Sequence, residues 1–390
     1  MQKKLIVLAL ASALSPIAFA QSNVTLYGVA DMSYVFADDN YNSNTKNLNA
    51  IQSGGLNGSR FGFSGSEDLG NGLKAKFRME GGVNMDTGAS ANTGVMGRWS
   101  TVSLASDSWG EIQAGRRETF HYELLKTSSG NGLGSVAQTS PVYLYQTRMS
   151  NAAVYLSPDW NGFQLKAGFS TNGTDGDGSD ASKGGNDVVP NPITTGTNTA
   201  ANSNLRVYTL ALNYQPGGKK GPLFLGASYD SNRLQDRTSI PGSLSGSSGD
   251  GSYNAGSVWN IAGAYDFGRV RVDGAFGMIN YAQNDQFKEV RDQRQQWTVG
   301  LVVPITERDR VMFDYAHAKL SYNVNNTKDD SMSLWGVNYM HDFSERTVLY
   351  AAYGKINQDD NFSYAKNMAS LSGTGSGYQQ ALQLGLRHNF

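Results

Sequence analysis

The sequence predicts an all-β protein, an antiparallel transmembrane β-barrel of about sixteen strands. Segments in which apolar and polar residues alternate recur along the 390 residues, and many of them run for about ten residues. A strand that crosses a membrane at a tilt needs about nine to eleven residues, whereas strands of soluble proteins average about five or six. The segments are joined alternately by short turns and long polar loops, which is typical of up-and-down membrane barrels.

The first twenty residues have the features of a signal peptide. Lys3 and Lys4 supply a positive start, residues 5–14 are almost wholly apolar, and Ala18 and Ala20 put small residues where a signal peptidase cleaves. An N-terminal membrane anchor is the alternative, but the apolar run has about half the length that a spanning helix requires. We therefore expect residues 1–20 to be removed and residues 21–390 to form the barrel.

The composition excludes several classes of protein. The chain has 46 Gly, 20 Tyr and 16 Phe but no Cys, so disulfides, thiolate metal sites and Cys nucleophiles are excluded. Without Lys3 and Lys4, 30 basic residues remain against 33 acidic ones, a net charge of −3. Nucleic-acid-binding proteins usually carry a strong basic excess, so we expect no nucleic-acid partner.

Each alternating segment has one apolar and one polar face, because successive side chains of a strand point to opposite sides. Residues 163–170 and 382–390 show this alternation, and none of the segments has helical spacing. The clearest example lies in residues 73–80, where one face carries Leu73, Ala75, Phe77 and Met79 and the other carries Lys74, Lys76, Arg78 and Glu80.

The connections indicate how the sheet closes. Backbone groups in a membrane must pair internally, so the sheet closes on itself, and about sixteen strands leave an aqueous lumen for the polar faces. Short turns occur at 68–72, 158–162, 266–268 and 304–309, and long polar loops at approximately 37–58, 82–97, 117–147, 171–203, 231–255, 282–294, 321–330 and 358–377.

Several stretches resemble the general porins of β-proteobacteria. Residues 23–31 (NVTLYGVAD) are similar to the opening strand of that family, and residues 64–73 (SGSEDLGNGL) are similar to its next hairpin. The Gly-Arg pairs at 97–98 and 115–116 and the terminal Phe390 follow in family order. The resemblance covers essentially the whole chain after residue 20. It implies a 16-stranded antiparallel transmembrane β-barrel, with the long third loop folded into the lumen, that forms a homotrimer in the Gram-negative outer membrane.

The resemblance also implies a function and partners. Members of this family are passive diffusion channels for small hydrophilic solutes and ions, surrounded by outer-membrane lipids and lipopolysaccharide. Phe390 resembles the signal by which the barrel-assembly machinery recognises its clients. The chain departs from some related porins because its third loop lacks a Pro-Glu-Phe-Gly turn and Arg117 adds a base after the usual Arg. The geometry of the constriction is therefore left open.

A basic wall is the expected functional site. A wall of bases that faces the third loop creates a transverse field in a narrow lumen, and an excess of one sign selects counter-ions, so we expect a weak to moderate preference for anions. The alternative is that partners such as Glu67 or Glu80 neutralise several bases and leave the pore almost unselective. The polar faces of strands supply Arg60, Lys74, Lys76, Arg78 and Lys166, the junctions between strands and loops supply Arg98, Arg116 and Arg148, and the third loop supplies the acids Glu118 and Glu123.

The sequence offers no catalytic or metal site. The four His residues are widely scattered, without the close spacing to Asp or Glu that a metal requires, and no nucleophile motif lies in a strand-to-helix setting. We therefore expect no enzymatic activity, no metal and no cofactor. Two other functions stay open, namely a channel specific for one solute and a surface adhesin that acts through its long loops.

Overall fold

A computed structural model describes residues 23–40, 47–92, 94–130, 135–137, 147–171, 205–218, 221–234, 255–281, 291–322, 329–358 and 378–390. The expected signal peptide and most residues of the loops at 171–203, 231–255 and 358–377 lie outside these ranges. No helix in the described ranges is both long enough and apolar enough to cross a membrane.

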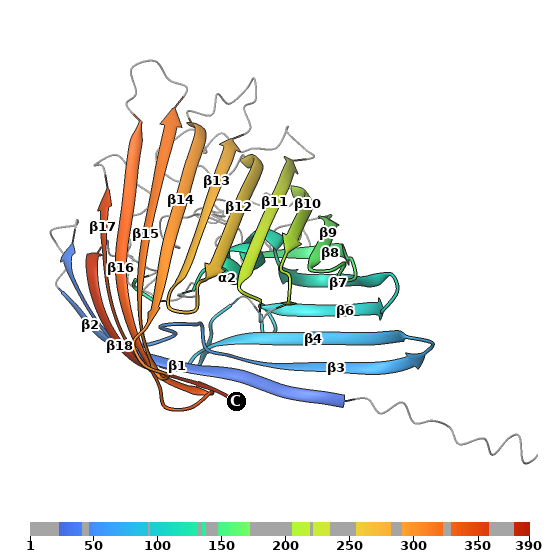
Figure 1. Ribbon diagram of the computed structural model, residues 1–390, viewed down its shortest axis with the longest axis horizontal. Helices are drawn as coiled ribbons and strands as arrows, with labels where there is room; N and C mark the ends of the chain where they lie inside the picture. The colour runs from blue at the N-terminus through green and yellow to red at the C-terminus, as the bar shows by residue number, and fades with distance from the viewer. Residues whose placement is uncertain are drawn as a thin grey trace, which may run out of the picture.

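The described residues form one helix and eighteen strands that belong to a single ring (Figure 1). Each strand pairs antiparallel with its neighbours, and β1 pairs with β18 to close the ring. Two of the strands, β2 and β5, are short additions beside β1 and β4, so the wall has the sixteen strands that the sequence predicts. The elements are β1 (Asn23–Asn40), β2 (Leu48–Ser53), β3 (Arg60–Gly70), β4 (Leu73–Asn84), β5 (Ala89–Ser90), β6 (Trp99–Ser106), β7 (Gly110–Glu118), α2 (Phe120–Ser128), β8 (Arg148–Leu156), β9 (Phe163–Ser170), β10 (Leu205–Tyr214), β11 (Leu223–Leu234), β12 (Ala255–Asp266), β13 (Arg271–Tyr281), β14 (Arg291–Pro304), β15 (Asp309–Tyr322), β16 (Asp330–Asp342), β17 (Thr347–Gln358) and β18 (Tyr378–Asn389).

The two faces of the wall differ as the alternation predicts. On β10, Leu210 and Leu212 are about half exposed on the outer face, while Thr209 and Ala211 are buried on the inner face. Polar side chains buried on the inner face include Arg294, Gln296, Asn338 and Gln383. Exposed apolar side chains are unfavourable in water and favourable in hydrocarbon, so the outer face is suited to a membrane. The polar inner face is suited to an aqueous lumen.

The last residue of the chain takes part in closing the ring. The amide of Gly28 donates to the Phe390 carbonyl oxygen at 3.0 Å, and the Phe390 amide donates to the Gly28 carbonyl oxygen at 3.1 Å. The Phe390 ring lies over Gly28 so closely that a Cβ atom at residue 28 would be 2.2 Å from the ring. The expected assembly signal is therefore also a packing element of the seam between β1 and β18.

The helix α2 lies in the third long loop, where no helix or strand was predicted from the sequence. Thr119 caps its N-terminus, because the Thr119 hydroxyl accepts a hydrogen bond from the Tyr122 amide at 3.1 Å. Phe120 and Leu124 lie four residues apart and are buried on one side of the helix. The period of 3.6 was obscured in the sequence because only nine residues carry it.

Candidate functional site

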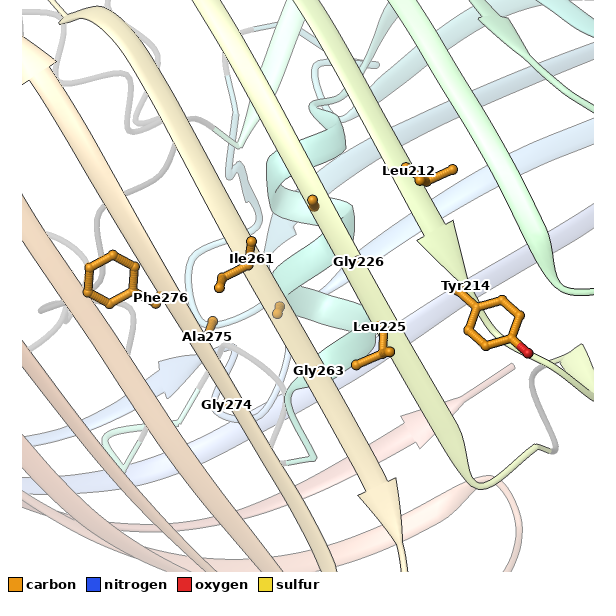
Figure 2. Close-up of a pocket in the computed structure, with 11 residues that line it drawn as sticks. Leu212, Tyr214, Leu225, Gly226, Ile261, Gly263, Gly274, Ala275 and Phe276 are labelled. Atoms are coloured by element: carbon orange, nitrogen blue, oxygen red, sulfur yellow. The ribbon is translucent and has the colours of Figure 1, made fainter.

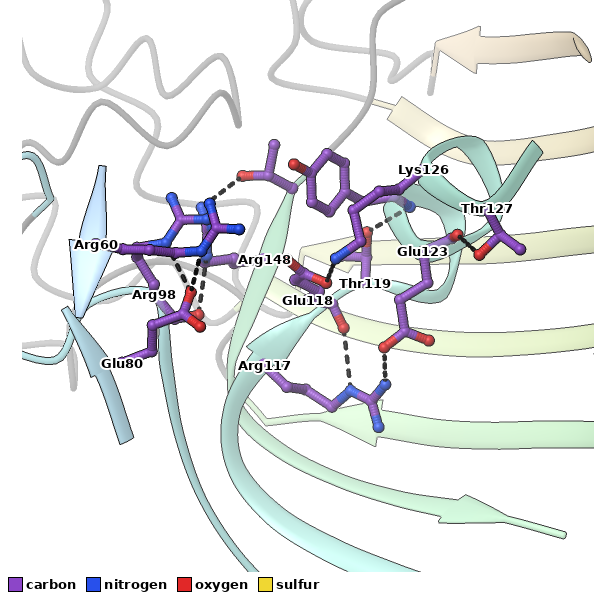
Figure 3. Close-up of polar contacts among 12 residues, drawn as sticks. Arg60, Glu80, Arg98, Arg117, Glu118, Thr119, Glu123, Lys126, Thr127 and Arg148 are labelled. Carbon is purple, nitrogen blue, oxygen red and sulfur yellow. Dashed lines mark hydrogen bonds and ion pairs between the residues drawn. The ribbon is translucent and has the colours of Figure 1, made fainter. Parts of the chain in front are cut away.

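The basic residues nearest the second long loop converge on one carboxylate. Glu80 is 3% exposed on β4 and forms ion pairs with Arg78 at 2.8 Å, Arg98 at 2.8 Å and Arg60 at 3.8 Å. The three guanidinium groups come from β4, from the residue before β6 and from the start of β3, which lie side by side in the wall. We call Arg60, Arg78, Arg98 and Glu80 the Glu80 cluster. Figure 3 shows Arg60 and Arg98 at Glu80.

Two aromatic side chains hold Arg78 in place. The Arg78 Nε atom donates to the Tyr27 hydroxyl at 2.8 Å, and that hydroxyl donates to Glu80 Oε2 at 3.0 Å. The guanidinium carbon of Arg78 also lies 4.1 Å from the centre of the Trp99 ring, within the range of a cation–π interaction. The position of this charge is therefore set by three neighbours, although 39% of the side chain is exposed.

Arg116 and Arg148 support the backbone that carries Arg98. Arg116 Nε donates to the Gly97 carbonyl oxygen at 2.6 Å, and its Nη1 donates to the Ser150 hydroxyl at 2.6 Å. Arg148 Nε donates to the Arg98 carbonyl oxygen at 2.9 Å. These bonds tie both arginines to the barrel wall and help to place Arg98 beside Glu80.

Lys74 and Lys76 lie farther along β4, toward a short turn. Lys76 pairs with Glu111 at 2.9 Å, and Lys74 pairs with the well-exposed Asp107 at 3.7 Å. The alternation places both lysines on the polar face, as expected, but each has an acidic partner of its own. They are therefore separate from the Glu80 cluster.

The acids of the third loop anchor α2 to the wall. Glu123 binds both Arg117, by a short ion pair, and Lys166 of β9, at 2.9 Å. Glu118 pairs with Lys126 at 2.6 Å, and its carbonyl oxygen accepts from Arg117 Nε at 3.0 Å. We call these five residues the helix anchor. Figure 3 shows Arg117, Glu118, Glu123 and Lys126 of this group beside Arg60, Glu80 and Arg98.

The charge state of Glu123 follows from its neighbours. Burial raises the pKa of this carboxyl, but the positive charges of Arg117, Lys166 and Lys126 outweigh burial and hold the pKa below its ordinary value of 4.5. Glu123 is therefore ionised at neutral pH, and its ion pairs are retained until the solution is acidic.

The apolar side of α2 packs on β11–β13, which follow β9 and β10 in the barrel. Leu124 and Leu125 pack against Phe224 of β11 and against Ala262 and Ala275 of the next two strands. Gly226 makes room for the helix, because a Cβ atom there would be 2.2 Å from Leu124 Cδ1. The inner face of β11–β13, formed by Phe224, Gly226 and the small alanines, thus makes the seat of the helix.

His121 adds a polar contact to this seat. Its Nδ1 atom lies 2.5 Å from the Asn260 side-chain nitrogen, and the ring is 1% exposed. Burial lowers the pKa of His121 from 6.5 to about 3. The imidazole is therefore neutral when the helix is docked.

A second piece of the third loop contacts a different part of the wall. The Val136 amide donates to Gln383 Oε1 of β18 at 3.1 Å, and Ala137 packs against Gly336 of β16. The connection thus touches β9–β13 with α2 and β16–β18 with residues 135–137. Residues 131–134 and 138–146 lie outside the described ranges, so the prediction that the whole loop folds into the lumen stays a prediction.

Together the two groups carry a positive excess. The Glu80 cluster has three cationic side chains and one carboxylate, and the helix anchor has three cationic side chains and two carboxylates. Six positive charges therefore stand against three negative ones. Such an arrangement attracts anions in water, because fixed charges beside a narrow aqueous path raise the local concentration of counter-ions.

The structure divides the residues of the predicted basic wall into separate groups and adds other residues to these groups. Arg60, Arg78 and Arg98 meet at Glu80, whereas Lys166 lies buried against Glu123. From the sequence, Arg117 was noted only as an extra base, Tyr27 was interpreted as an aromatic residue at the membrane interface, and Lys126 and Trp99 were not singled out. The Tyr27 hydroxyl instead bonds to Arg78 and Glu80. The spacing of Lys126, three residues after Glu123 on a short helical repeat, was the available signal for its side of α2.

Comparisons with known proteins agree with the fold. The model of the family described as Gram-negative porin matches residues 6–361. An outer membrane porin protein of Bordetella pertussis is 30% identical over 430 residues, with 100% of both chains covered. Outer membrane porin protein 32 of Delftia acidovorans is 26% identical over 408 residues, again with 100% of both chains covered.

A solved structure resembles the whole barrel. An anion-selective porin from Comamonas acidovorans has a TM-score of 0.67 at 20% identity, over 95% of this chain and 100% of that chain. These relatives are channels rather than enzymes. Since the family model covers most of the sequence, the chain belongs to the Gram-negative porin family and is a passive diffusion channel of the outer membrane.

Proposed function

We propose that this porin admits small hydrophilic solutes and prefers anions to cations, weakly to moderately. The observation that carries the proposal is the Glu80 cluster, in which one buried carboxylate faces three guanidinium groups. Arg60 and Arg78 keep 23% and 39% of their side chains exposed, so their charge reaches the solvent. The name of the anion-selective structural relative supports the same sign of selectivity.

The constriction is formed, in this proposal, by α2 with its anchor on one side and by the Glu80 cluster on the other. Contacts of α2 with β10–β13 and of Val136 with β18 support it, since they hold the third loop against inward-facing side chains on two sides of the ring. The pore-lining members are then Arg60, Arg78, Arg98 and Lys126, while Lys166, Arg116 and Arg148 position them.

Reversal potentials in a KCl gradient test the proposal. Arg60→Ala with Arg78→Ala should shift the reversal potential toward cation preference, because two of the six positive charges are lost. Arg308→Ala with Arg346→Ala is the matched control, since both residues lie exposed in short turns. If the first pair shifts the potential no more than the control pair, the Glu80 cluster does not set selectivity.

Single-channel currents separate this function from its alternatives. A general channel gives currents that rise linearly with solute concentration, whereas a solute-specific channel saturates or is blocked by its own solute. A surface adhesin gives no conductance. Three equal current steps for each insertion are expected if the protein is a homotrimer, a state supported by the trimer form of a structural neighbour.

Export and assembly are part of the proposal. Cleavage after Ala20 leaves Gln21 as the first residue, which N-terminal sequencing of the outer-membrane protein tests. Phe390 is proposed as the residue that the barrel-assembly machinery recognises, in addition to its contact with Gly28. The protein is proposed to have no enzymatic activity, no metal and no cofactor.

A further inference from the structure

The lipid-facing surface of β10–β13 contains an apolar groove of about 580 Å³. Its floor and walls come from four neighbouring strands, and α2 lies directly behind it on the other face of the sheet (Figure 2). The largest side chains on its rim are Leu212, Leu225, Ile261, Phe276 and the ring of Tyr214.

The groove exists because two glycines are paired across the outer face. One row of outward residues runs Tyr214, Leu225, Gly263, Gly274 and Val299 from β10 to β14. The rows on either side carry Ile261 with Phe276 and Tyr265 with Val272. Gly263 and Gly274 are neighbours without side chains, and the large side chains around them form the walls of the groove.

The wall itself does not require glycine at these positions. A Cβ atom at residue 263 would be 3.0 Å from Leu225 Cδ2, and one at residue 274 would be 3.1 Å from the Thr298 carbonyl oxygen. Both distances are tight but need only a small adjustment, and neither glycine has a positive φ. Glycine in the interior of a strand weakens it and often marks a place where a ligand approaches the backbone closely. An occupant of the groove explains the pair better than the fold does.

The position of the groove defines the occupant. Gly263 precedes the end of β12 at Asp266 by three residues, so the groove lies about 10 Å from the short turn at 267–270. Short turns of such barrels face the periplasm, so the groove lies in the hydrocarbon of the periplasmic leaflet. The only chemistry available there, apart from other proteins, is an acyl chain.

The turn supplies the complementary charge. Arg269 is exposed at the end of the barrel below the groove, at the level of lipid phosphates. The neighbouring Asp266 carboxylate is occupied by the Gly268 amide at 2.7 Å, and Arg271 points inward to the Ser128 carbonyl oxygen at 2.9 Å. We propose that the groove holds an acyl chain of an anionic phospholipid of the periplasmic leaflet, with its phosphate at Arg269.

Native mass spectrometry of the mature oligomer, offered phosphatidylglycerol or phosphatidylcholine at equal concentration, tests this proposal. The wild-type protein should retain phosphatidylglycerol, and Gly263→Leu should lower the retained fraction at least fivefold because leucine fills the groove. Arg269→Gln should lower phosphatidylglycerol retention to the level of phosphatidylcholine. Ala351→Leu, which enlarges an outward side chain on β17, is the matched control and should retain lipid like the wild type.

Ala227→Leu fills the same groove from β11 and replaces no glycine, so it provides the test if Gly263→Leu fails to fold. Equal retention by the wild type and the filled variants overturns the proposal, as does an equal loss in Ala351→Leu. If filling the groove reduces the mass of the oligomer and leaves lipid retention unchanged, the occupant is a second copy of the chain, and the lipid proposal is wrong.

Discussion

Replacing Glu80 with Gln isolates the charge of the cluster from its shape. Gln has nearly the same volume as Glu but one acceptor oxygen in place of two, so either Arg98 or the pair of Arg78 and Tyr27 loses its acceptor. The local excess rises from two positive charges to three. Because Glu80 is 3% exposed and its arginine partners are partly exposed, the loss of the ion pairs should cost on the order of 1–3 kcal/mol of stability. A barrel of sixteen strands should tolerate that loss, and resistance to heat in detergent gels checks that the variant is folded.

The size of the selectivity change follows from Coulomb's law. One unit charge changes the energy of an ion at about 4 Å by about 1 kcal/mol in water, and at about 8 Å by about half as much. The energies of an anion and a cation change in opposite directions, so the two effects add in their ratio. Screening over about 10 Å at 0.1 M salt reduces the change to roughly a twofold to tenfold increase in the anion-to-cation permeability ratio.

Reversal potentials in a KCl gradient measure this ratio. Glu80→Gln should move the potential toward stronger anion preference at about 0.1 M salt, and most of the change should vanish near 1 M, where the screening length is about 3 Å. Glu307→Gln makes the same chemical change at an exposed turn residue and should leave the potential unchanged. If folded Glu80→Gln behaves like Glu307→Gln, or if its effect is insensitive to salt, the electrostatic explanation is wrong.

Three further predictions concern the helix and the seam. When α2 is undocked, His121 takes up a proton below its ordinary pKa of 6.5, whereas docked His121 does so only near a pKa of about 3, so the free energy of docking should weaken by about 1.4 kcal/mol per pH unit over this range as pH falls. Hydrogen exchange of the α2 amides, corrected for intrinsic rates, should show this slope. His121→Asn should abolish the slope above pH 4.5, where Glu123 stays ionised. Thr119→Ala removes the N-cap and should cost about 1 kcal/mol of helix stability by the same measurement, while Thr119→Ser should cost much less. Gly28→Ala places a Cβ atom against the Phe390 ring and should lower the thermal unfolding temperature through about 1–3 kcal/mol of overpacking, and an unchanged temperature would show that the seam is looser than its contacts indicate.

The inner and outer faces of the barrel strands could be predicted from the sequence because strand alternation is a local property. The polar phase of residues 74–80 put Lys74, Lys76, Arg78 and Glu80 on one face, and the structure agrees. Alternation does not give the position of a side chain along the barrel, however. Lys74 and Arg78 are separated by four residues, or about 13 Å along the strand. Lys74 therefore pairs with Asp107 near a short turn, while Arg78 belongs to the Glu80 cluster.

The partners of the third loop were beyond local reasoning. Glu123 and Lys166 are 43 residues apart in sequence and meet only because α2 crosses to β9. The helix has only nine residues, so the spacing of its apolar residues does not distinguish it from an irregular loop. Predicting Lys166 as a wall residue was possible from its phase on β9, but its role as an anchor depends on a contact that no periodic pattern contains.

The choice of arginine at the Glu80 cluster explains how a positive excess is kept in place. A guanidinium group has five donors in a fixed plane, so Arg60 can hold the Gly58 carbonyl oxygen at 2.8 Å while it also faces Glu80. Arg78 likewise holds Tyr27 and Glu80 together and stacks on Trp99. Lysine has a single ammonium group on a flexible stem, and Lys76 and Lys74 accordingly each hold one acid. Repulsion among the arginines is offset by one shared carboxylate and by uncharged hydrogen-bond acceptors, so the guanidinium groups are held by several contacts without being neutralised. A field that selects anions needs both properties, since a flexible cation would fold onto its partner and a fully paired one would attract no ion.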